Sequence, residues 1–284
     1  MDKKHNRRQF LQILGAGTAA RVAAATGGQA VDYARGASRA NDKQLKLGLA
    51  SYTLRKFDLD KTLAMTRRLG LKYIALKSMH LPLESSPAQI AEAAEKVKNA
   101  GLELYGGGVI YMKDQAEVNL AFDYAKAAGM KVIIGAPVPE LLASVNRKVQ
   151  QYDIKVAIHN HGPGDKNYPT PASVYERIKD LDKRIGLCND IGHTMRAGED
   201  PSVSAEELAD RLLDVHIKDE SAATAKGQAV EVGRGVIDIP KFLRTLSKIN
   251  YTGVVAFEYE KDADDPLPGL AESVGYVRGV IAAM

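Results

Sequence analysis

Short apolar runs alternate along this chain with longer segments whose apolar residues recur three and four positions apart. The short runs have strand length and predict buried strands at residues 47–50, 73–77, 103–106, 131–135, 155–159, 185–189, 213–218 and 254–259. The longer segments predict amphipathic helices at residues 59–69, 87–100, 115–128, 139–152, 172–181, 204–211, 239–249 and 266–283. Gly70, Gly101 and Gly129 each follow such a segment, as helix ends require.

Eight strand–helix units predict an α/β fold with a parallel sheet, because a helical crossover returns the chain to the same edge of the sheet. Two architectures satisfy this order: a closed (β/α)8 barrel, the TIM barrel, in a single domain, and a doubly wound open sheet. Polar residues cluster at the ends of at least four runs, and a closed ring brings such ends together around one axis. We therefore favour the barrel.

Four predicted strands end in side chains that bind divalent cations. Asp190 and His216 end two successive strands, and His159 and Glu258 end two others. Alternate residues of a strand face the same way, so these four can face the barrel axis while apolar neighbours such as Val215 face the helices. Borderline divalent cations take mixed oxygen and nitrogen ligands. The pattern therefore predicts a metal site.

The composition is that of an ordinary globular protein, with 284 residues, 45% hydrophobic and 26% charged. The formal net charge is only +4 and much of it lies near the N-terminus, so we expect no nucleic-acid partner. Cys188 is the only cysteine, which excludes an internal disulfide. Its position inside a predicted strand is typical of a small core residue.

The first forty-odd residues differ in kind from the rest. Arg7 and Arg8 precede Phe10 and Leu11, and a modestly apolar run rich in Ala and Gly follows. This order resembles a twin-arginine export signal, although Arg21 interrupts the apolar run. A disordered basic tail is the alternative, and the run is too short and too weakly apolar for a membrane span.

On this basis we expect residues 1–41 to form an export signal and linker, and residues 42–284 to form the barrel domain. The partners would then include the twin-arginine export machinery, and the location would be the periplasm or another exported compartment. The pathway carries folded proteins, so the barrel would acquire its metal before it crosses the membrane.

The longest connection between predicted elements runs from residue 220 to residue 238 and carries Arg234 between Gly233 and Gly235. It exceeds the usual loop length, which favours a lid or a substrate loop. Arg234 is then a contact for an anion or a hydroxyl group. An exposed arginine between two turn glycines is the alternative.

Four motifs carry a resemblance to a known family. They are Asp-Ile-Gly-His at 190–193, His-Ile-Lys-Asp at 216–219, Gly-Arg-Gly-Val-Ile-Asp at 233–238 and Phe-Glu at 257–258. Their order resembles that of the xylose-isomerase-like barrels, the sugar isomerase and epimerase superfamily, and the resemblance covers nearly all of the chain after the signal.

The resemblance implies a divalent cation (Mn, Co, Mg or Zn) held by a Glu, an Asp, a His and a second Glu. The last three fall on Asp190, His216 and Glu258, and the first falls on His159, where this sequence departs from the pattern. Imidazole is a good ligand, so a cation can still bind. One of the two carboxylate bases of the epimerases is missing, however.

Glu258 is expected to be both the base and a metal ligand. The expected acid, on the other side of the substrate, is Lys77, His161 or His193. The alternative for Lys77 is a surface lysine with its ammonium in solvent, and the alternative for His193 is a residue that orients a ligand. The expected substrate contacts are His80, Lys218 and Arg234.

Three functions fit these residues. The first is a sugar or keto-sugar isomerase or epimerase, in which the cation polarises a carbonyl and a base removes the adjacent proton to give an enediolate. The second is an exported lyase or dehydratase acting on 3-keto sugars or keto-glycosides, in which the enediolate expels a leaving group. The third is a non-catalytic periplasmic sugar-binding barrel. The DNA-repair endonuclease branch of the superfamily needs more metal ligands and a basic face, so we do not favour it. A homo-oligomer is compatible with the sequence.

Overall fold

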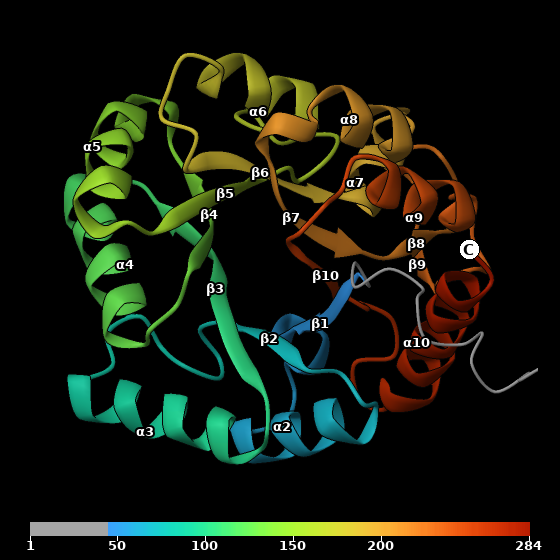
Figure 1. The fold of residues 1–284 in the computed structure, drawn as a ribbon, viewed down its shortest axis with the longest axis horizontal. Helices are drawn as coiled ribbons and strands as arrows, with labels where there is room; N and C mark the ends of the chain where they lie inside the picture. Colours follow the sequence, from blue (N-terminus) through green and yellow to red (C-terminus); the bar gives the residue numbers. More distant parts are fainter. Residues whose placement is uncertain (1–44) are drawn as a thin grey trace, which may run out of the picture. The chain divides into compact units, whose positions relative to one another are not determined.

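The computed structural model describes residues 45–284. Eight parallel strands close into a barrel with helices between them (Figure 1), so the predicted fold is confirmed. The order around the ring is β1, β10, β7, β6, β5, β4, β3, β2. The barrel strands are β1 (Lys46–Ala50), β2 (Tyr73–Leu76), β3 (Glu103–Met112), β4 (Val132–Pro137), β5 (Lys155–His159), β6 (Ile185–Asp190), β7 (Leu212–Ile217) and β10 (Val254–Phe257).

Helices surround the strands, and most begin at a side chain that caps the first turn. The α-helices are α2 (Leu59–Arg68), α3 (Pro87–Asn99), α4 (Gln115–Ala127), α5 (Leu142–Tyr152), α6 (Pro171–Ile178), α7 (Ile191–Arg196), α8 (Pro201–Glu207), α9 (Ile239–Lys248) and α10 (Leu267–Ala282). Short 3-10 turns lie at Ser51–Leu54, Pro139–Leu141 and Ala209–Arg211. Ser86 and Thr170 close capping boxes at α3 and α6, which the sequence encodes locally.

Two apolar layers hold the barrel together, as the alternation of inward and outward residues predicts. Small inward residues such as Ala157, Cys188 and Ala256 form a cluster inside the ring. Outward residues such as Val215 and Phe257 belong to a larger cluster with the helices. The strand parity read from the sequence is therefore confirmed, and it directs the polar strand ends inward.

Three local features differ from the sequence-based expectation. β3 continues to Met112, well past its expected end, and therefore carries Tyr111 to the mouth of the barrel. Two short helices, α7 and α8, replace the one helix expected after β6. The long connection contains a two-stranded antiparallel ladder formed by β8 (Asp219–Glu220) and β9 (Ala229–Val230).

The buried carboxylate of Asp219 organises the long connection. It accepts hydrogen bonds from the backbone N–H groups of Gly233 and Gly235, both at 2.9 Å, and of Ile237 at 3.1 Å. A Cβ at position 235 would collide with this carboxylate, so only glycine allows the approach. The loop is therefore tied to the start of β8.

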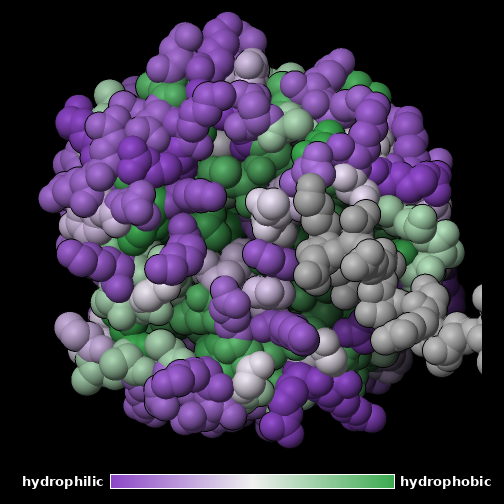
Figure 2. Space-filling view, viewed as in Figure 1, coloured by the Kyte–Doolittle hydropathy of each residue, from purple (hydrophilic) through white to green (hydrophobic). Residues whose placement is uncertain are grey.

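The surface of the described residues is mixed in character. Figure 2 shows hydrophilic residues over most of the periphery of one face, with apolar residues further in. Within residues 45–284, no helix is both long and apolar enough to cross a membrane. The predicted export signal lies outside the described residues.

Candidate metal centre

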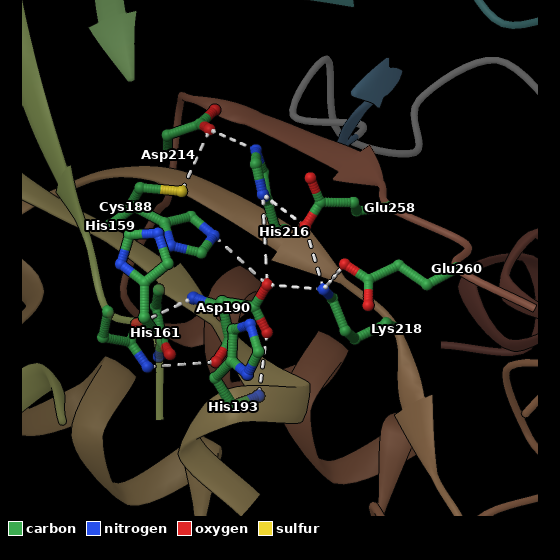
Figure 3. Close-up of polar contacts among 12 residues, drawn as sticks. His159, His161, Cys188, Asp190, His193, Asp214, His216, Lys218, Glu258 and Glu260 are labelled. Carbon is green, nitrogen blue, oxygen red and sulfur yellow. Dashed lines mark hydrogen bonds and ion pairs between the residues drawn. The ribbon is translucent and has the colours of Figure 1, made fainter. Parts of the chain in front are cut away.

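The four predicted metal ligands come together inside one end of the barrel (Figure 3). His159, Asp190, His216 and Glu258 lie on or just after β5, β6, β7 and β10, which are neighbours in the ring. One ligand atom from each lies within 4.8 Å of the others, and all four side chains are buried. The group is therefore compact enough to be a candidate site for one ion.

Asp190 serves the fold and the site with different oxygens. Its Oδ1 accepts a hydrogen bond from the backbone N–H of His193 at 2.9 Å and so caps α7. Its Oδ2 faces the cluster, 3.3 Å from Nε2 of His159 and 4.0 Å from Nδ1 of His216. The helix cap therefore fixes the direction in which the second oxygen points.

His159 offers two nitrogen atoms that have no hydrogen-bond partner within residues 45–284. Burial lowers its pKa to about 3, against the opposing effect of Asp190. The imidazole is therefore neutral at physiological pH and can donate a lone pair to a cation. Its nearest rings are those of His161, at 4.5 Å between centroids, and His216, at 4.9 Å.

Lys218 places an ammonium group among the carboxylates. Its Nζ lies 2.9 Å from Oδ2 of Asp190, 2.8 Å from Oε2 of Glu258 and 3.1 Å from Oε1 of Glu260. Burial by itself would lower the pKa of Lys218, but Asp190 and Glu258 raise it well above its usual value. The sequence placed Lys218 at the substrate; the structure makes it the counter-ion of two predicted ligands.

The ionised state of the two carboxylates follows from the same contacts. Burial would raise the pKa of Glu258, but Lys218 and His216 hold it well below its usual range. Burial likewise opposes ionisation of Asp190, and Lys218 again reverses the effect. Both side chains are therefore charged at neutral pH.

The donor set fits a borderline divalent cation. Two buried imidazoles and two carboxylates match the ligands of Zn, Mn and Co sites, and the unpartnered nitrogens of His159 point to a missing contact. Asp190 and Glu258 would help to hold the cation, and their oxygens Oδ2 and Oε2 already contact the ammonium of Lys218. His159, Cys188 and His216 form a second close group, but the Cys188 thiol donates to Asp214.

Two further predicted residues lie beside the cluster. Nε2 of His161 and the hydroxyl oxygen of Tyr111 are hydrogen-bonded at 3.1 Å, and the two rings are stacked. His193, at the start of α7, has its ring 5.8 Å from that of His159. Burial lowers the pKa of both His161 and His193. Both imidazoles therefore line the approach to the cluster in neutral form.

Lys77 and His80 follow β2 but have different surroundings. The Nζ of Lys77 donates to the carbonyl of Val109 at 3.0 Å and lies 5.6–5.7 Å from the centres of the Tyr52 and Tyr111 rings. Burial lowers the pKa of Lys77, against the opposing charge of Glu258. His80 is buried and contacts the hydroxyl groups of Ser51 and Thr62. Lys77 thus faces the mouth, whereas His80 is held inside the protein.

Arg234 is not brought to the cluster. Its guanidinium forms a bidentate ion pair with Glu272 of α10, and its side chain is 62% exposed. The Asp219 contacts that tie down the loop set this direction. A role for Arg234 at the substrate stays a prediction that these contacts do not support.

Sequence reasoning missed three residues near the site. Asp214 lies behind His216 on β7, Glu220 is buried after Lys218, and Tyr111 stands at the end of β3 with 50% of its surface exposed. Asp214 could have been found from strand parity, since it shares a face with His216. No such signal pointed to Glu220 or Tyr111, because their positions beside the site depend on where the strands end.

A family model described as xylose isomerase-like TIM barrel matches residues 21–280 of the chain. The chain belongs to this family. The resemblance inferred from the four motifs is therefore confirmed at the level of the family.

Two curated relatives match about half of the chain. The rhizopine catabolism protein MocC of Rhizobium meliloti is 24% identical over an alignment of 157 positions that covers 48% of this chain and 46% of that protein. The inosose dehydratase of Mesomycoplasma hyopneumoniae (strain 7448) is 26% identical over an alignment of 152 positions that covers 47% of this chain and 50% of that protein. The chain thus spans about half the length of these relatives.

Solved structures show the same fold over most of the chain. The IolI protein with a bound zinc atom has a TM-score of 0.70 at 18% identity, covering 84% of this chain and 99% of that chain. The 3-keto-D-glucoside 4-epimerase of E. coli has a TM-score of 0.67 at 16% identity, covering 83% and 100%. At these identities the likeness establishes the fold.

Proposed function

We propose that this protein is a divalent-metal-dependent enzyme that removes the proton next to the carbonyl of a sugar or keto-sugar, and that it acts as an isomerase. The observation that carries the proposal is the convergence of two buried imidazoles with the ionised carboxylates of Asp190 and Glu258. The contacts of Glu258 with His216 and Lys218 both fall on Oε2, which leaves Oε1 to face a substrate.

His159, Asp190, His216 and Glu258 would hold the cation, which when bound would polarise a substrate carbonyl and lower the pKa of the adjacent C–H group. Glu258 then accepts that proton, while Lys218 holds its carboxylate in place. The hydroxyl proton on the carbon that lost its hydrogen passes to the former carbonyl oxygen, and Glu258 returns its proton to the former carbonyl carbon, so that the carbonyl moves by one position. One base on one face of the substrate is sufficient for this reaction.

Epimerisation by two bases has less support from the geometry. It needs a second proton-exchanging group on the opposite face of the substrate carbon, and by the resemblance His159 stands where the family has the first of its two glutamates. Burial lowers the pKa of His159 to about 3, so its imidazole is a weak base at neutral pH. His161 is the nearest alternative.

The second candidate is a lyase or dehydratase acting on 3-keto sugars or keto-glycosides. Elimination also needs only one base, together with an acid that protonates the leaving oxygen. Lys77 fits that acid, because its ammonium lies at the mouth between Tyr52 and Tyr111. The curated relative named inosose dehydratase also favours this candidate.

Proton exchange distinguishes these reactions. Metal-loaded protein is incubated in deuterated water with keto-sugars, inososes and 3-keto-glycosides, and the products are followed by NMR. Exchange with a new isomer supports the isomerase, and loss of water or an aglycone supports the lyase. Sugar binding without either would favour the non-catalytic barrel.

Two variants assign the base in the same experiment. Glu258→Gln should lower the exchange rate by about 10² to 10⁴ fold, the usual contribution of a general base. Glu272→Gln is the matched control, since its carboxylate pairs with Arg234 on α10. An unchanged exchange rate in Glu258→Gln would contradict the mechanism.

We also propose export by the twin-arginine pathway, on the basis of Arg7, Arg8 and the residues that follow them. Fractionation of cells that express the full chain tests this. The protein should be found in the periplasm, and replacement of both arginines by lysine should retain it inside the cell. An unchanged distribution would contradict export by this route.

A further inference from the structure

Asn160 is a buried amide that directly follows the predicted metal ligand His159. Its side chain has no exposed surface, and β5 ends one residue before it. The pairing of β5 with β6 stops where His159 stands opposite Cys188, whereas β6 continues to Asp190. The main chain of Asp190 therefore needs hydrogen-bond partners that the strand ladder with β5 no longer supplies.

The side chain of Asn160 supplies these partners. Its Oδ1 accepts a hydrogen bond from the backbone N–H of Asp190 at 3.0 Å, and its Nδ2 donates to the carbonyl of Asp190 at 3.4 Å. The orientation of the amide follows from these contacts, because a backbone N–H group can only donate and so requires the amide oxygen. An amide side chain has the same donor and acceptor as a peptide group. Asn160 thus extends the pairing of the two strands by one step.

Thr194 of α7 binds the other side of the same amide. Nδ2 of Asn160 donates to Oγ1 of Thr194 at 3.1 Å. This Oγ1 lies 2.8 Å from the carbonyl oxygen of Asp190 and 2.8 Å from Oδ1 of Asn189, which both can accept its proton. Thr194 is also fully buried. A residue next to His159 therefore holds the whole turn from the end of β6 into α7.

The contacts of Asp190 divide between its main chain and its two carboxylate oxygens. Asn160 holds the main chain, and the backbone N–H of His193 holds Oδ1. Oδ2 faces the cluster, 3.3 Å from Nε2 of His159 and 2.9 Å from Nζ of Lys218 (Figure 3). Lys218 balances the charge of this oxygen but does not hold the main chain behind it. The separation of His159 from Asp190 therefore depends on Asn160.

We propose that Asn160 is a positioning residue that keeps His159 and Asp190 at the spacing that one cation requires. The inference rests on the proposed metal function. Groups that bind a metal have to be held to within about 0.5 Å of their working positions. Asn160 is covalently joined to one predicted ligand and hydrogen-bonded to the main chain of the other. Without it, the ends of β5 and β6 can move apart, and the two ligands with them.

A purely structural role for Asn160 is the alternative. Buried main-chain groups need partners wherever they lie, so loss of Asn160 would then reduce stability and leave the arrangement of the ligands unchanged. Ser204 provides a matched control at the far end of the same network. Its Oγ accepts a hydrogen bond from Nδ2 of Asn189 at 3.2 Å and, within residues 45–284, bonds to none of the four predicted ligands.

The first measurement is the affinity for Zn²⁺, by competition with a chelator. Asn160→Ala removes the amide, and we expect an affinity about 10- to 100-fold weaker. Thr194→Val removes one partner of the amide at nearly equal volume and should weaken binding about fivefold. Ser204→Ala should change it less than about twofold. Thermal unfolding shows whether each variant is folded, and Thr194→Val carries the test if Asn160→Ala is not.

The second measurement reports the arrangement of the ligands. The visible absorption of bound Co²⁺ depends on the number and geometry of its ligands. At saturating Co²⁺, Asn160→Ala should give a spectrum different from that of the wild type, and Ser204→Ala should give the wild-type spectrum. A purely structural role would leave all three spectra the same once the sites are filled.

Unchanged affinity in both Asn160→Ala and Thr194→Val overturns the inference and leaves the proposed function intact. An unchanged Co²⁺ spectrum at saturation also overturns it, as does a loss of affinity in Ser204→Ala as large as that in Asn160→Ala. If the wild type binds neither Zn²⁺ nor Co²⁺, the proposed metal function fails, and the inference fails with it.

Discussion

The two halves of the barrel ring are built from different residues. Strands β5, β6, β7 and β10 are neighbours and supply all four predicted ligands from their ends. Strands β1 to β4 close the other half, and their inward positions carry apolar residues and glycines such as Gly106. Adjacent strands lie about 4.8 Å apart, so a set of ligands this compact must come from neighbouring strands.

The comparison shows which half of the barrel bears the free-energy cost of burying charged side chains. One half buries Asp190, Glu258 and Asp214 and balances the first two with Lys218. The other half is uncharged in its interior and packs its backbones closely at Gly106. Each half should therefore respond to a different kind of substitution.

The largest expected effect follows from removal of the buried ammonium group of Lys218. Lys218→Met leaves the buried charges of Asp190 and Glu258 unpaired, so the free energy of unfolding in a chelator should fall by about 3–5 kcal/mol. Divalent metal at 100 times its dissociation constant should restore about 2.7 kcal/mol. Denaturant titrations with and without metal measure both values.

Lys77→Met is the matched control for this change, because the ammonium that it removes contacts a carbonyl and two aromatic rings and forms no ion pair within residues 45–284. The loss of stability in this variant should stay below about 1 kcal/mol. An equal loss in the two variants would contradict the contrast between the two halves.

The second effect concerns packing in the uncharged half. A Cβ added at Gly106 would lie 2.8 Å from both the carbonyl oxygen and a side-chain carbon of Val132. Gly106→Ala should therefore reduce stability by about 1–3 kcal/mol, the usual cost of overpacking. The metal affinity of the folded protein should not change.

Gly275→Ala is the control for the glycine substitution, because nothing lies within 4 Å of a Cβ at that position in α10. Alanine is the better helix former, so we expect a gain of up to about 1 kcal/mol. A loss of metal affinity in Gly106→Ala would show that the uncharged half also positions the ligands.

A third, smaller effect depends on pH. Burial raises the pKa of Glu220 to about 7, and its Oε2 has no hydrogen-bond partner within residues 45–284. The folded protein therefore binds this proton more tightly than the unfolded chain, and its stabilising contribution is lost as the pH rises through about 7. Glu220→Gln should stabilise the protein by about 1 kcal/mol at pH 8 and by almost nothing at pH 5. Thermal unfolding across this range measures the difference, and a gain that is equal at both values would contradict it.

The smallest effect is expected at Arg234, which lies in the long connection and outside both halves. Its exposed pair with Glu272 contributes less than about 1 kcal/mol, so Arg234→Ala should change stability little. The KM for the substrate identified by proton exchange should also stay the same. A tenfold rise in KM would support the contact with substrate that the sequence suggested.

Much of the fold could be predicted from local signals. The apolar runs and the helical periodicity reproduced the eight strands, because burial on both faces of a parallel strand requires a nearly continuous apolar run. Helix ends followed from caps and glycines. The end of β3 and the pair α7 and α8 were missed, since those boundaries depend on packing at the mouth of the barrel.

The predicted ligands could be nominated from the sequence for a similar reason. His159, Asp190, His216 and Glu258 each end an apolar strand, and strand parity turns them inward. Arg234 was nominated by its loop alone, and the sequence gives no sign that Asp219 would tie that loop down with the arginine facing Glu272. A loop's direction depends on partners that are distant in the chain.

The sequence by itself determined the alternation of strands and helices, the membership of the family and the residues that end the strands on the site side, because each is encoded by residues close together in the chain. Only the tertiary structure decided that four neighbouring strands carry the predicted ligands, that Lys218 balances their charge, and that Asp214 stands behind His216. These relations arise when the ring closes and side chains from distant segments meet in a space without water, where each charge requires a partner.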